Sequence, residues 1–138
     1  MDRTSGAHGA GMDENRGLPP GARGRRLADA PTTSVVVASA GDRAALERCL
    51  AALLPQCAEH GVEVVVARSC SKEEYQSLAA AHPSVLFMPA ATQSTPGQLR
   101  AVGTSAADGD IVYLTDDARI EPPGFVAERL AFWTRGVP

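Results

Sequence analysis

The chain has 138 residues, which is enough for one domain with a buried core and too short for two. Its 44% hydrophobic and 21% charged residues, with a formal net charge of -3, describe an ordinary globular protein rather than a polyanion binder, so we expect no nucleic-acid partner. No segment approaches the ~20 consecutive apolar residues of a membrane span, and no N-terminal apolar run is typical of a signal peptide, so we expect no membrane span and a cytoplasmic location.

The N-terminal segment differs in composition from the rest of the chain. Residues 1–33 hold six of the thirteen glycines and three of the ten prolines, but almost no large apolar side chains. Such a segment cannot bury enough apolar surface to offset the entropy of ordering. We therefore predict a disordered tail over 1–33 and a single domain over 34–138.

The domain begins by alternating strands with helices. Residues 34–40 (SVVVASA) contain a continuous β-branched run without charged residues, which is typical of a buried parallel strand. Asp42 suits the N-cap of a helix, and apolar residues then recur at helical spacing up to Pro55, with His60 expected at the helix end. Residues 62–67 (VEVVVA) predict a second buried strand.

The second half continues the alternation. Ser71 and Glu74 match a capping box for a helix over 72–81. The remaining expected elements are a strand over 85–88, a helix over 96–107, a strand over 111–114 and a last helix over 125–133.

This order of elements, with crossover helices and no hairpin signals, predicts an α/β fold: a mostly parallel, twisted sheet with flanking helices of the Rossmann-like nucleotide-binding type. A dinucleotide fingerprint is excluded because SAGDRAA, and not GxGxxG, follows the first strand, and no P-loop motif is present. Cys49, Cys57 and Cys70 lack CxxC spacing and indicate neither a disulfide framework nor a zinc site.

An adjacent pair of carboxylates, Asp116 and Asp117, follows the fourth predicted strand, and Pro122 and Pro123 break the chain shortly after. Ligands of open α/β sheets bind outside the carboxyl ends of the strands, and hard cations and their phosphate partners favour carboxylate oxygens there. The same pair is also compatible with a plain solvated turn, where Asp is common.

Four segments carry a resemblance to a known family: SVVVASAGDRAALERCLAALLPQ over 34–56, EVVVARS over 63–69, PGQLRAVGTSAADGD over 96–110 and IVYLTDDARIEPPGF over 111–125. In order and spacing they resemble the N-terminal, nucleotide-sugar-binding half of family 2 glycosyltransferases, which have the GT-A fold. The resemblance implies a nucleoside-diphosphate sugar as ligand, contacted by Ala38, Ser39, Arg43, Arg68, Arg100 and Asp116. It also implies Mg²⁺ or Mn²⁺ as a cofactor, bound by Asp116 and Asp117.

The chain departs from the family pattern at three places. Arg68 stands where the family has a base-reading acid, and Ala101 stands where it has Asn. The third position of the Asp-x-Asp motif falls on Ala118, so the motif is degraded. If the chain stays extended there, Asp116 and Asp117 point to opposite sides, and one face offers a single carboxylate.

Two functions follow as hypotheses. The first is a glycosyltransferase-like domain that binds a nucleotide-diphosphate sugar with a divalent metal for glycosyl transfer to an unknown acceptor. Because no residue after Pro122 is a convincing catalytic base, a second subunit or a homodimer would complete the acceptor site. The alternative is a non-catalytic pseudo-glycosyltransferase, or a truncated fragment, that acts as a binding or interaction module.

Overall fold

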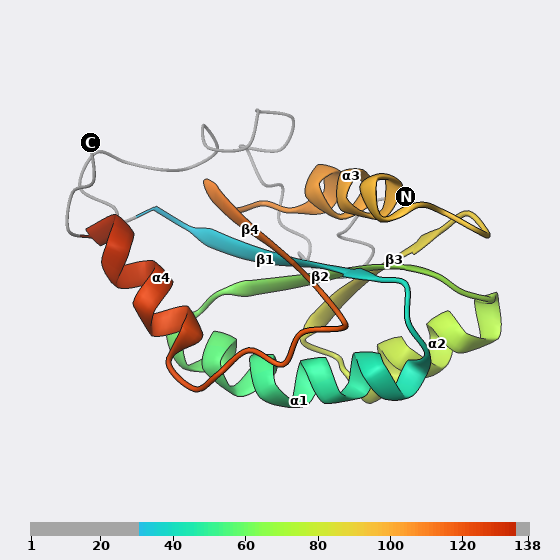
Figure 1. Ribbon diagram of the computed structural model, residues 1–138, viewed down its shortest axis with the longest axis horizontal. Coiled ribbons are helices and arrows are strands. Elements are labelled where there is room, and N and C mark those ends of the chain that lie inside the picture. Colours follow the sequence, from blue (N-terminus) through green and yellow to red (C-terminus); the bar gives the residue numbers. More distant parts are fainter. Residues whose placement is uncertain (1–30, 135–138) are drawn as a thin grey trace, which may run out of the picture.

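A computed structural model describes residues 31–134. One four-stranded parallel sheet is flanked by helices on both faces, which confirms the α/β class and the order of elements (Figure 1). Most of the predicted tail, residues 1–30, lies outside the described residues, and Thr33 already belongs to the first strand. The elements are β1 (Thr33–Ser39), α1 (Arg43–His60), β2 (Glu63–Ser69), α2 (Lys72–Ala81), β3 (Val85–Ala90), α3 (Pro96–Ala106), β4 (Ile111–Asp116) and α4 (Phe125–Thr134).

The sheet has the strand order β3-β2-β1-β4, and every neighbouring pair is parallel. β1 is central, and all seven of its residues are buried, as its continuous β-branched run predicts. The register sets Ala38 of β1 beside Ala67 of β2 and Asp116 of β4. The carboxyl ends of these three strands therefore lie side by side at one end of the sheet, where the sequence places its candidate ligand groups.

Helices cover both faces of the sheet. α1, α2 and α4 lie on one face and α3 lies on the other (Figure 1). Val35 and Val37 of β1 pack into the cluster under α1, whereas Val36 packs on the α3 side, because successive strand residues face opposite ways. Gly103 lets α3 approach closely, since a Cβ at this position would overlap Cγ1 of Val36. The core is thus two apolar layers that share the sheet between them.

α1 is longer than its apolar repeat suggests, because it continues through Pro55 to His60. The placement of His60 at the helix end is confirmed. Proline removes one helical N–H, but Cys57 beyond it is buried in the core, which favours one further turn. The helix ends at Gly61, whose left-handed φ of 66° and N–H bond to the Cys57 carbonyl form a C-cap.

The N-cap predicted for α1 is confirmed, since Asp42 accepts the Ala45 N–H at 2.8 Å, whereas the capping at α2 differs from the prediction. At α2, Ser71 accepts a hydrogen bond from the Glu74 N–H at 3.1 Å, but the Glu74 carboxylate binds Arg68 instead of returning to Ser71. The predicted capping box is therefore only half formed. A complete box forms at α3, where the side chains of Thr95 and Gln98 each bond the other's backbone N–H.

The cysteines are unbridged, and two of them are buried. Burial raises the pKa of Cys49 to about 11, and the nearby charges of Asp117, Glu121 and Asp116 add to this effect. Burial alone raises the pKa of Cys57 to about 12. Neither thiol is a ready nucleophile at neutral pH, because the thiolate is the reactive form.

No helix within residues 31–134 is long and apolar enough to cross a membrane.

Candidate functional site

The carboxyl ends of β1, β2 and β4 are joined by a buried polar network around Ser39. Its hydroxyl donates a hydrogen bond to Oδ2 of Asp117 at 2.8 Å and accepts one from Arg68 at 2.8 Å. The same Oδ2 accepts the backbone N–H of Gly41 at 2.9 Å. The side chains of Arg68 and Asp117 are 9% and 6% exposed, with 4.0 Å between Nη1 and Oδ2. These residues therefore hold the strand ends together.

Arg68 is the hub of this network. Its Nη1 also donates to the Gly41 carbonyl at 2.8 Å, and its Nε and Nη2 lie 3.1 and 3.0 Å from Oε2 of Glu74 at the start of α2. A buried guanidinium needs this many acceptors, because the desolvation of an unpaired charge is costly. Arg68 is therefore a buried cation whose hydrogen-bond acceptors all come from the protein itself.

The two adjacent aspartates point to different places. Asp117 is buried and turns back into the network, whereas Asp116, the last residue of β4, lines a pocket. Oδ1 of Asp116 accepts the backbone N–H of Ala118 at 2.9 Å, which shapes the turn after the strand. One carboxylate is therefore presented toward the pocket, and the other stabilises the strand end.

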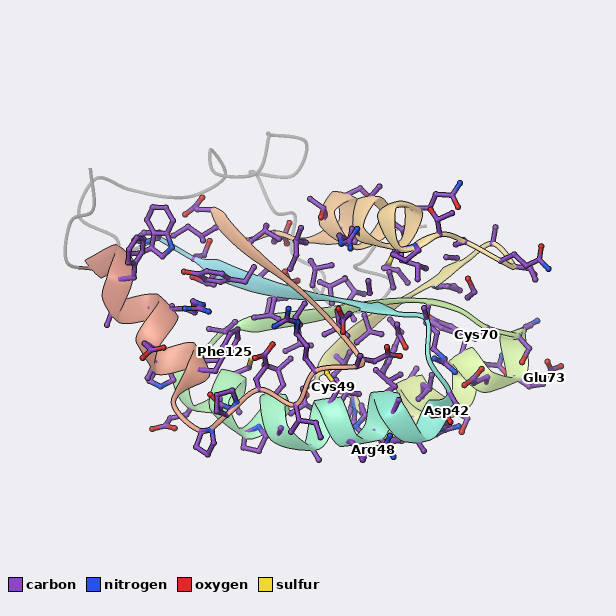
Figure 2. The ribbon with its side chains drawn as sticks, in the orientation of Figure 1. Asp42, Arg48, Cys49, Cys70, Glu73 and Phe125 are labelled. Carbon is purple, nitrogen blue, oxygen red and sulfur yellow. The ribbon has the colours of Figure 1, made fainter. Side chains whose placement is uncertain are left out.

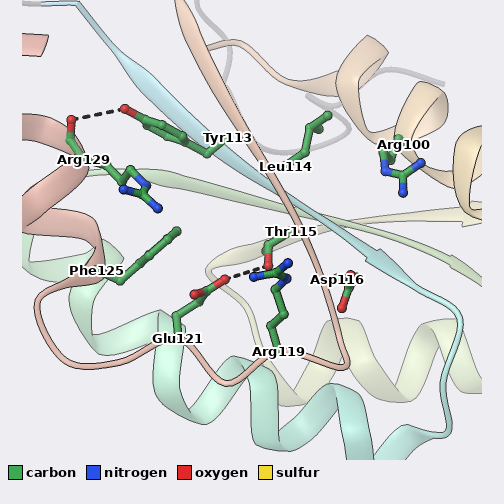
Figure 3. A pocket seen from close by; sticks show the side chains of 9 residues that line it. All are labelled: Arg100, Tyr113, Leu114, Thr115, Asp116, Arg119, Glu121, Phe125 and Arg129. Carbon is green, nitrogen blue, oxygen red and sulfur yellow. Dashed lines mark hydrogen bonds between the residues drawn. The ribbon is translucent and has the colours of Figure 1, made fainter. Parts of the chain in front are cut away.

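The pocket has a volume of about 380 Å³ and lies beside β4 (Figure 3). Three arginines contribute to its lining: Arg100 from α3, Arg119 from the loop after β4 and Arg129 from α4. All three are exposed, and within residues 31–134 none of their guanidinium groups forms an ion pair with a carboxylate. The other lining residues are Tyr113, Leu114, Thr115, Asp116, Glu121 and Phe125. Converging, unpaired guanidinium groups are suited to an anion such as a phosphate.

Several pocket residues were not singled out by the sequence analysis. Glu121 is buried and accepts a hydrogen bond from the Thr115 hydroxyl at 2.7 Å, which ties the loop to β4. Tyr113 donates to the Arg129 carbonyl at 3.1 Å, and the Arg129 guanidinium lies 5.0 Å from the centre of the Phe125 ring. The available signal was the density of charge close to the aspartates, since Arg119 and Glu121 follow within five residues.

The predicted ligand residues thus fall into separate groups. Arg100 and Asp116 share the pocket, while Ser39, Arg68 and Asp117 form the buried network beside it. The last two predicted ligand residues, Ala38 and Arg43, join neither group through their side chains. Ala38 is buried at the end of β1, and Arg43 bonds Ser77 of α2 at 2.9 Å and Glu47 of its own helix at 3.3 Å.

The residues available for a metal ion are few. Within residues 31–134, no group of three or more His, Cys, Asp or Glu side chains is arranged to hold one. Of the predicted pair, Asp116 presents a carboxylate at the pocket, while Oδ2 of Asp117 already accepts two hydrogen bonds. A cation would therefore need oxygen ligands from a bound diphosphate and from water in addition to Asp116.

Comparison with known proteins gives a likeness in structure but no match in sequence. No known protein family matches the chain, and no curated protein sequence matches it either. The chain is similar to the crystal structure of residues 1–349 of S. aureus TarS, a glycosyltransferase, with a TM-score of 0.53 and 19% sequence identity. The likeness covers 75% of this chain and 32% of that one. It shows an α/β fold shared with about a third of that TarS chain.

Proposed function

We propose that this domain binds a nucleoside-diphosphate sugar and is the donor-binding part of a family 2-like glycosyltransferase. The observation that carries the proposal is the pocket at the end of β4, where Arg100 and Asp116 meet two further arginines, Arg119 and Arg129. Ligand sites of parallel α/β sheets lie at such strand ends. The glycosyltransferase-like fold supports the same class of ligand.

The diphosphate would be bound mainly by charge. Arg100 and Arg119 reach the pocket from α3 and from the loop after β4, so they approach a bound anion from different directions (Figure 3). Planar guanidinium groups donate paired hydrogen bonds to phosphate oxygens, and each such bond to a charged group contributes about 1.5–3 kcal/mol. In glycosyl transfer the bond between the sugar and the diphosphate breaks, and the same cations would stabilise the charge that develops on the leaving group.

A divalent cation fits this site only together with the diphosphate. Asp116 would supply one carboxylate oxygen, and phosphate oxygens and water would supply the rest, which suits Mg²⁺ and Mn²⁺ because such ions retain several waters. Asp117 would contribute through the network, since release of its Oδ2 would leave the Gly41 N–H and Ser39 without their acceptor. We therefore assign the metal-ligand role to Asp116 and a positioning role to Asp117.

The nucleoside would lie above the ends of β1 and β2. Ala38 and Ser39 would form the floor of this area. Arg68 stands where an acid that reads the nucleobase is expected. Both Nη1 hydrogens of Arg68 are taken up by Ser39 and Gly41, so we propose that Arg68 shapes the wall of the site. Recognition of the base by a carboxylate is not available at this position.

A second candidate function, a non-catalytic binding module, is favoured by the commitment of Asp117 and Arg68 to internal bonds. Both candidates bind the donor, and they differ in turnover. An active protein would also need an acceptor site and a base, which a partner subunit would provide. Slow metal-dependent hydrolysis of the bound donor would separate the active form from the module.

Isothermal titration calorimetry with UDP-, GDP- and dTDP-sugars, with and without Mn²⁺, tests the proposal. We expect metal-dependent binding of one nucleotide class, weakened about tenfold or more in Arg100→Gln, which loses a charged contact to phosphate. Arg48→Gln is the matched control, because Arg48 is exposed on the side of α1 that faces away from the sheet (Figure 2). The proposal is wrong if no donor binds, or if both variants bind equally well.

A further inference from the structure

The loop between β4 and α4 carries a buried carboxylate, Glu121, which is 8% exposed. Its Oε2 accepts a hydrogen bond from the hydroxyl of Thr115, itself a buried residue of β4, at 2.7 Å. The carboxylate is also near α1, since its charge, together with that of Asp117, adds to the burial that raises the pKa of the Cys49 thiol. Glu121 is therefore enclosed between the edge strand and the helix beneath it.

The two buried carboxylates among residues 31–134 differ in how well they are satisfied. Oδ2 of Asp117 accepts two hydrogen bonds and lies 4.0 Å from the Arg68 guanidinium. Glu121 forms no ion pair within residues 31–134, and its Oε1 accepts no hydrogen bond from that part of the chain. A buried carboxylate oxygen without a hydrogen-bond donor is costly. The donor for Oε1 therefore comes from outside these residues.

This carboxylate lines the pocket that we assign to the diphosphate. Five charged residues contribute to the lining, three of them arginines and two of them acids: Arg100, Arg119, Arg129, Asp116 and Glu121. Figure 3 shows Asp116 and Arg100 toward one side of the pocket and Glu121 toward the other, with Arg119 between the two acids. The two carboxylates therefore face different parts of one bound molecule.

The proposed position of the donor leads its sugar toward Glu121. The nucleoside would lie above the ends of β1 and β2, and the diphosphate beside Asp116 at the end of β4, the next strand of the sheet. The sugar is attached to the end of the diphosphate that is remote from the nucleoside, so it continues past β4. On that side the pocket is lined by Glu121 and by the rings of Phe125 and Tyr113 (Figure 3). Aromatic rings with a few fixed polar groups are typical of small-molecule sites.

We propose that Glu121 is a specificity-determining residue for the donor, in which Oε1 accepts a hydrogen bond from a hydroxyl group of the sugar while Thr115 holds Oε2. The inference rests on the proposed donor binding. A carboxylate only accepts hydrogen bonds and repels phosphate, so its partner in the pocket is a hydroxyl or an N–H group. A bond from a hydroxyl to a carboxylate is charge-assisted. A sugar without a hydroxyl at this place is rejected, because it leaves the buried acid unpaired.

Isothermal titration calorimetry with matched ligands tests the role of Glu121. Each nucleoside diphosphate is compared with its sugar compound, as UDP with UDP-glucose, GDP with GDP-mannose and dTDP with dTDP-glucose. In Glu121→Gln we expect the Kd of the bound sugar compound to rise about tenfold or more, since a bond to a charged group is lost. The Kd of the diphosphate alone should stay equal or fall, because a negative charge is removed from the pocket. Glu59→Gln, at an exposed position of α1, should change neither value.

A second variant separates contact from charge. Glu121→Asp keeps the negative charge but withdraws it by one methylene, so the sugar compound should again bind more weakly while the diphosphate is unaffected. Parallel weakening of both ligands in the two variants, or an unchanged Kd for the sugar compound, overturns the role of Glu121 and leaves donor binding standing. Binding of the diphosphates without any sugar compound also overturns this role. No binding of any of these ligands to the wild type overturns both proposals.

Discussion

Replacing Asp117 with alanine is expected to destabilise the domain far more than the same change at Asp116. The Asp117 carboxylate accepts hydrogen bonds from Ser39 at 2.8 Å and from the Gly41 N–H at 2.9 Å, and it lies 4.0 Å from Nη1 of Arg68. Two bonds to a charged acceptor contribute about 3–6 kcal/mol together. Because Ser39 keeps its bond from Arg68, and Arg68 keeps Glu74, we expect a loss near the lower end, about 3–4 kcal/mol.

Asp116→Ala removes a single bond, from the Ala118 N–H, and should cost at most about 1 kcal/mol. Urea denaturation followed by circular dichroism measures both free energies of unfolding, and the melting temperature of Asp117→Ala should fall by roughly 15 °C or more. A loss below about 1 kcal/mol for Asp117→Ala, or equal losses for the two variants, would refute the structural assignment of Asp117.

Two further predictions concern the packing of α3 and the response to pH. Gly103→Ala should destabilise the domain by about 1–3 kcal/mol, because a Cβ there overlaps Val36. Gly97→Ala, in the same helix, has room for the added methyl group and should be neutral or stabilising. Equal denaturation midpoints for the two variants would contradict the close approach of α3. At Glu47, burial acts to raise the pKa, but the hydrogen bonds and charges of His82 and Arg43 outweigh it and lower the pKa. Its carboxylate therefore stabilises the fold above the ordinary carboxyl pKa of about 4.3, and this contribution is lost as the pH falls through the lowered value. In Glu47→Gln, the free energy of unfolding should fall less between pH 6 and pH 3 than it does in the wild type. An equal fall in both proteins would count against this role of the Glu47 carboxylate.

Much of the fold could be predicted from the sequence because its patterns are strong. The uninterrupted β-branched runs of β1 and β2 indicate strands that are buried on both faces, and the structure has them at the centre of the sheet. Element ends were less predictable. α1 passes through Pro55 because tertiary burial of Cys57 favours another turn, and β4 extends to Asp116 because its register with Ala38 continues the ladder.

The candidate site was only partly predictable, since adjacency in sequence does not determine direction in space. Asp116 and Asp117 look equivalent in sequence, yet one lines the pocket and the other joins Ser39 and Arg68. Glu74 matched a capping box, but the buried guanidinium of Arg68 is the stronger partner for its carboxylate. Arg129 reaches the pocket only because α4 folds back toward Tyr113, a tertiary contact without a local signal.

The most direct test of donor binding is a chemical-shift map of the ¹⁵N-labelled chain titrated with a UDP- or GDP-sugar in the presence of Mg²⁺. We expect the largest changes at the carboxyl ends of β1, β2 and β4 and on α3 near Arg100, and we expect Asp116→Ala to suppress the Mg²⁺-dependent part. Changes confined to other surfaces, or none at millimolar donor, would contradict donor binding at this site.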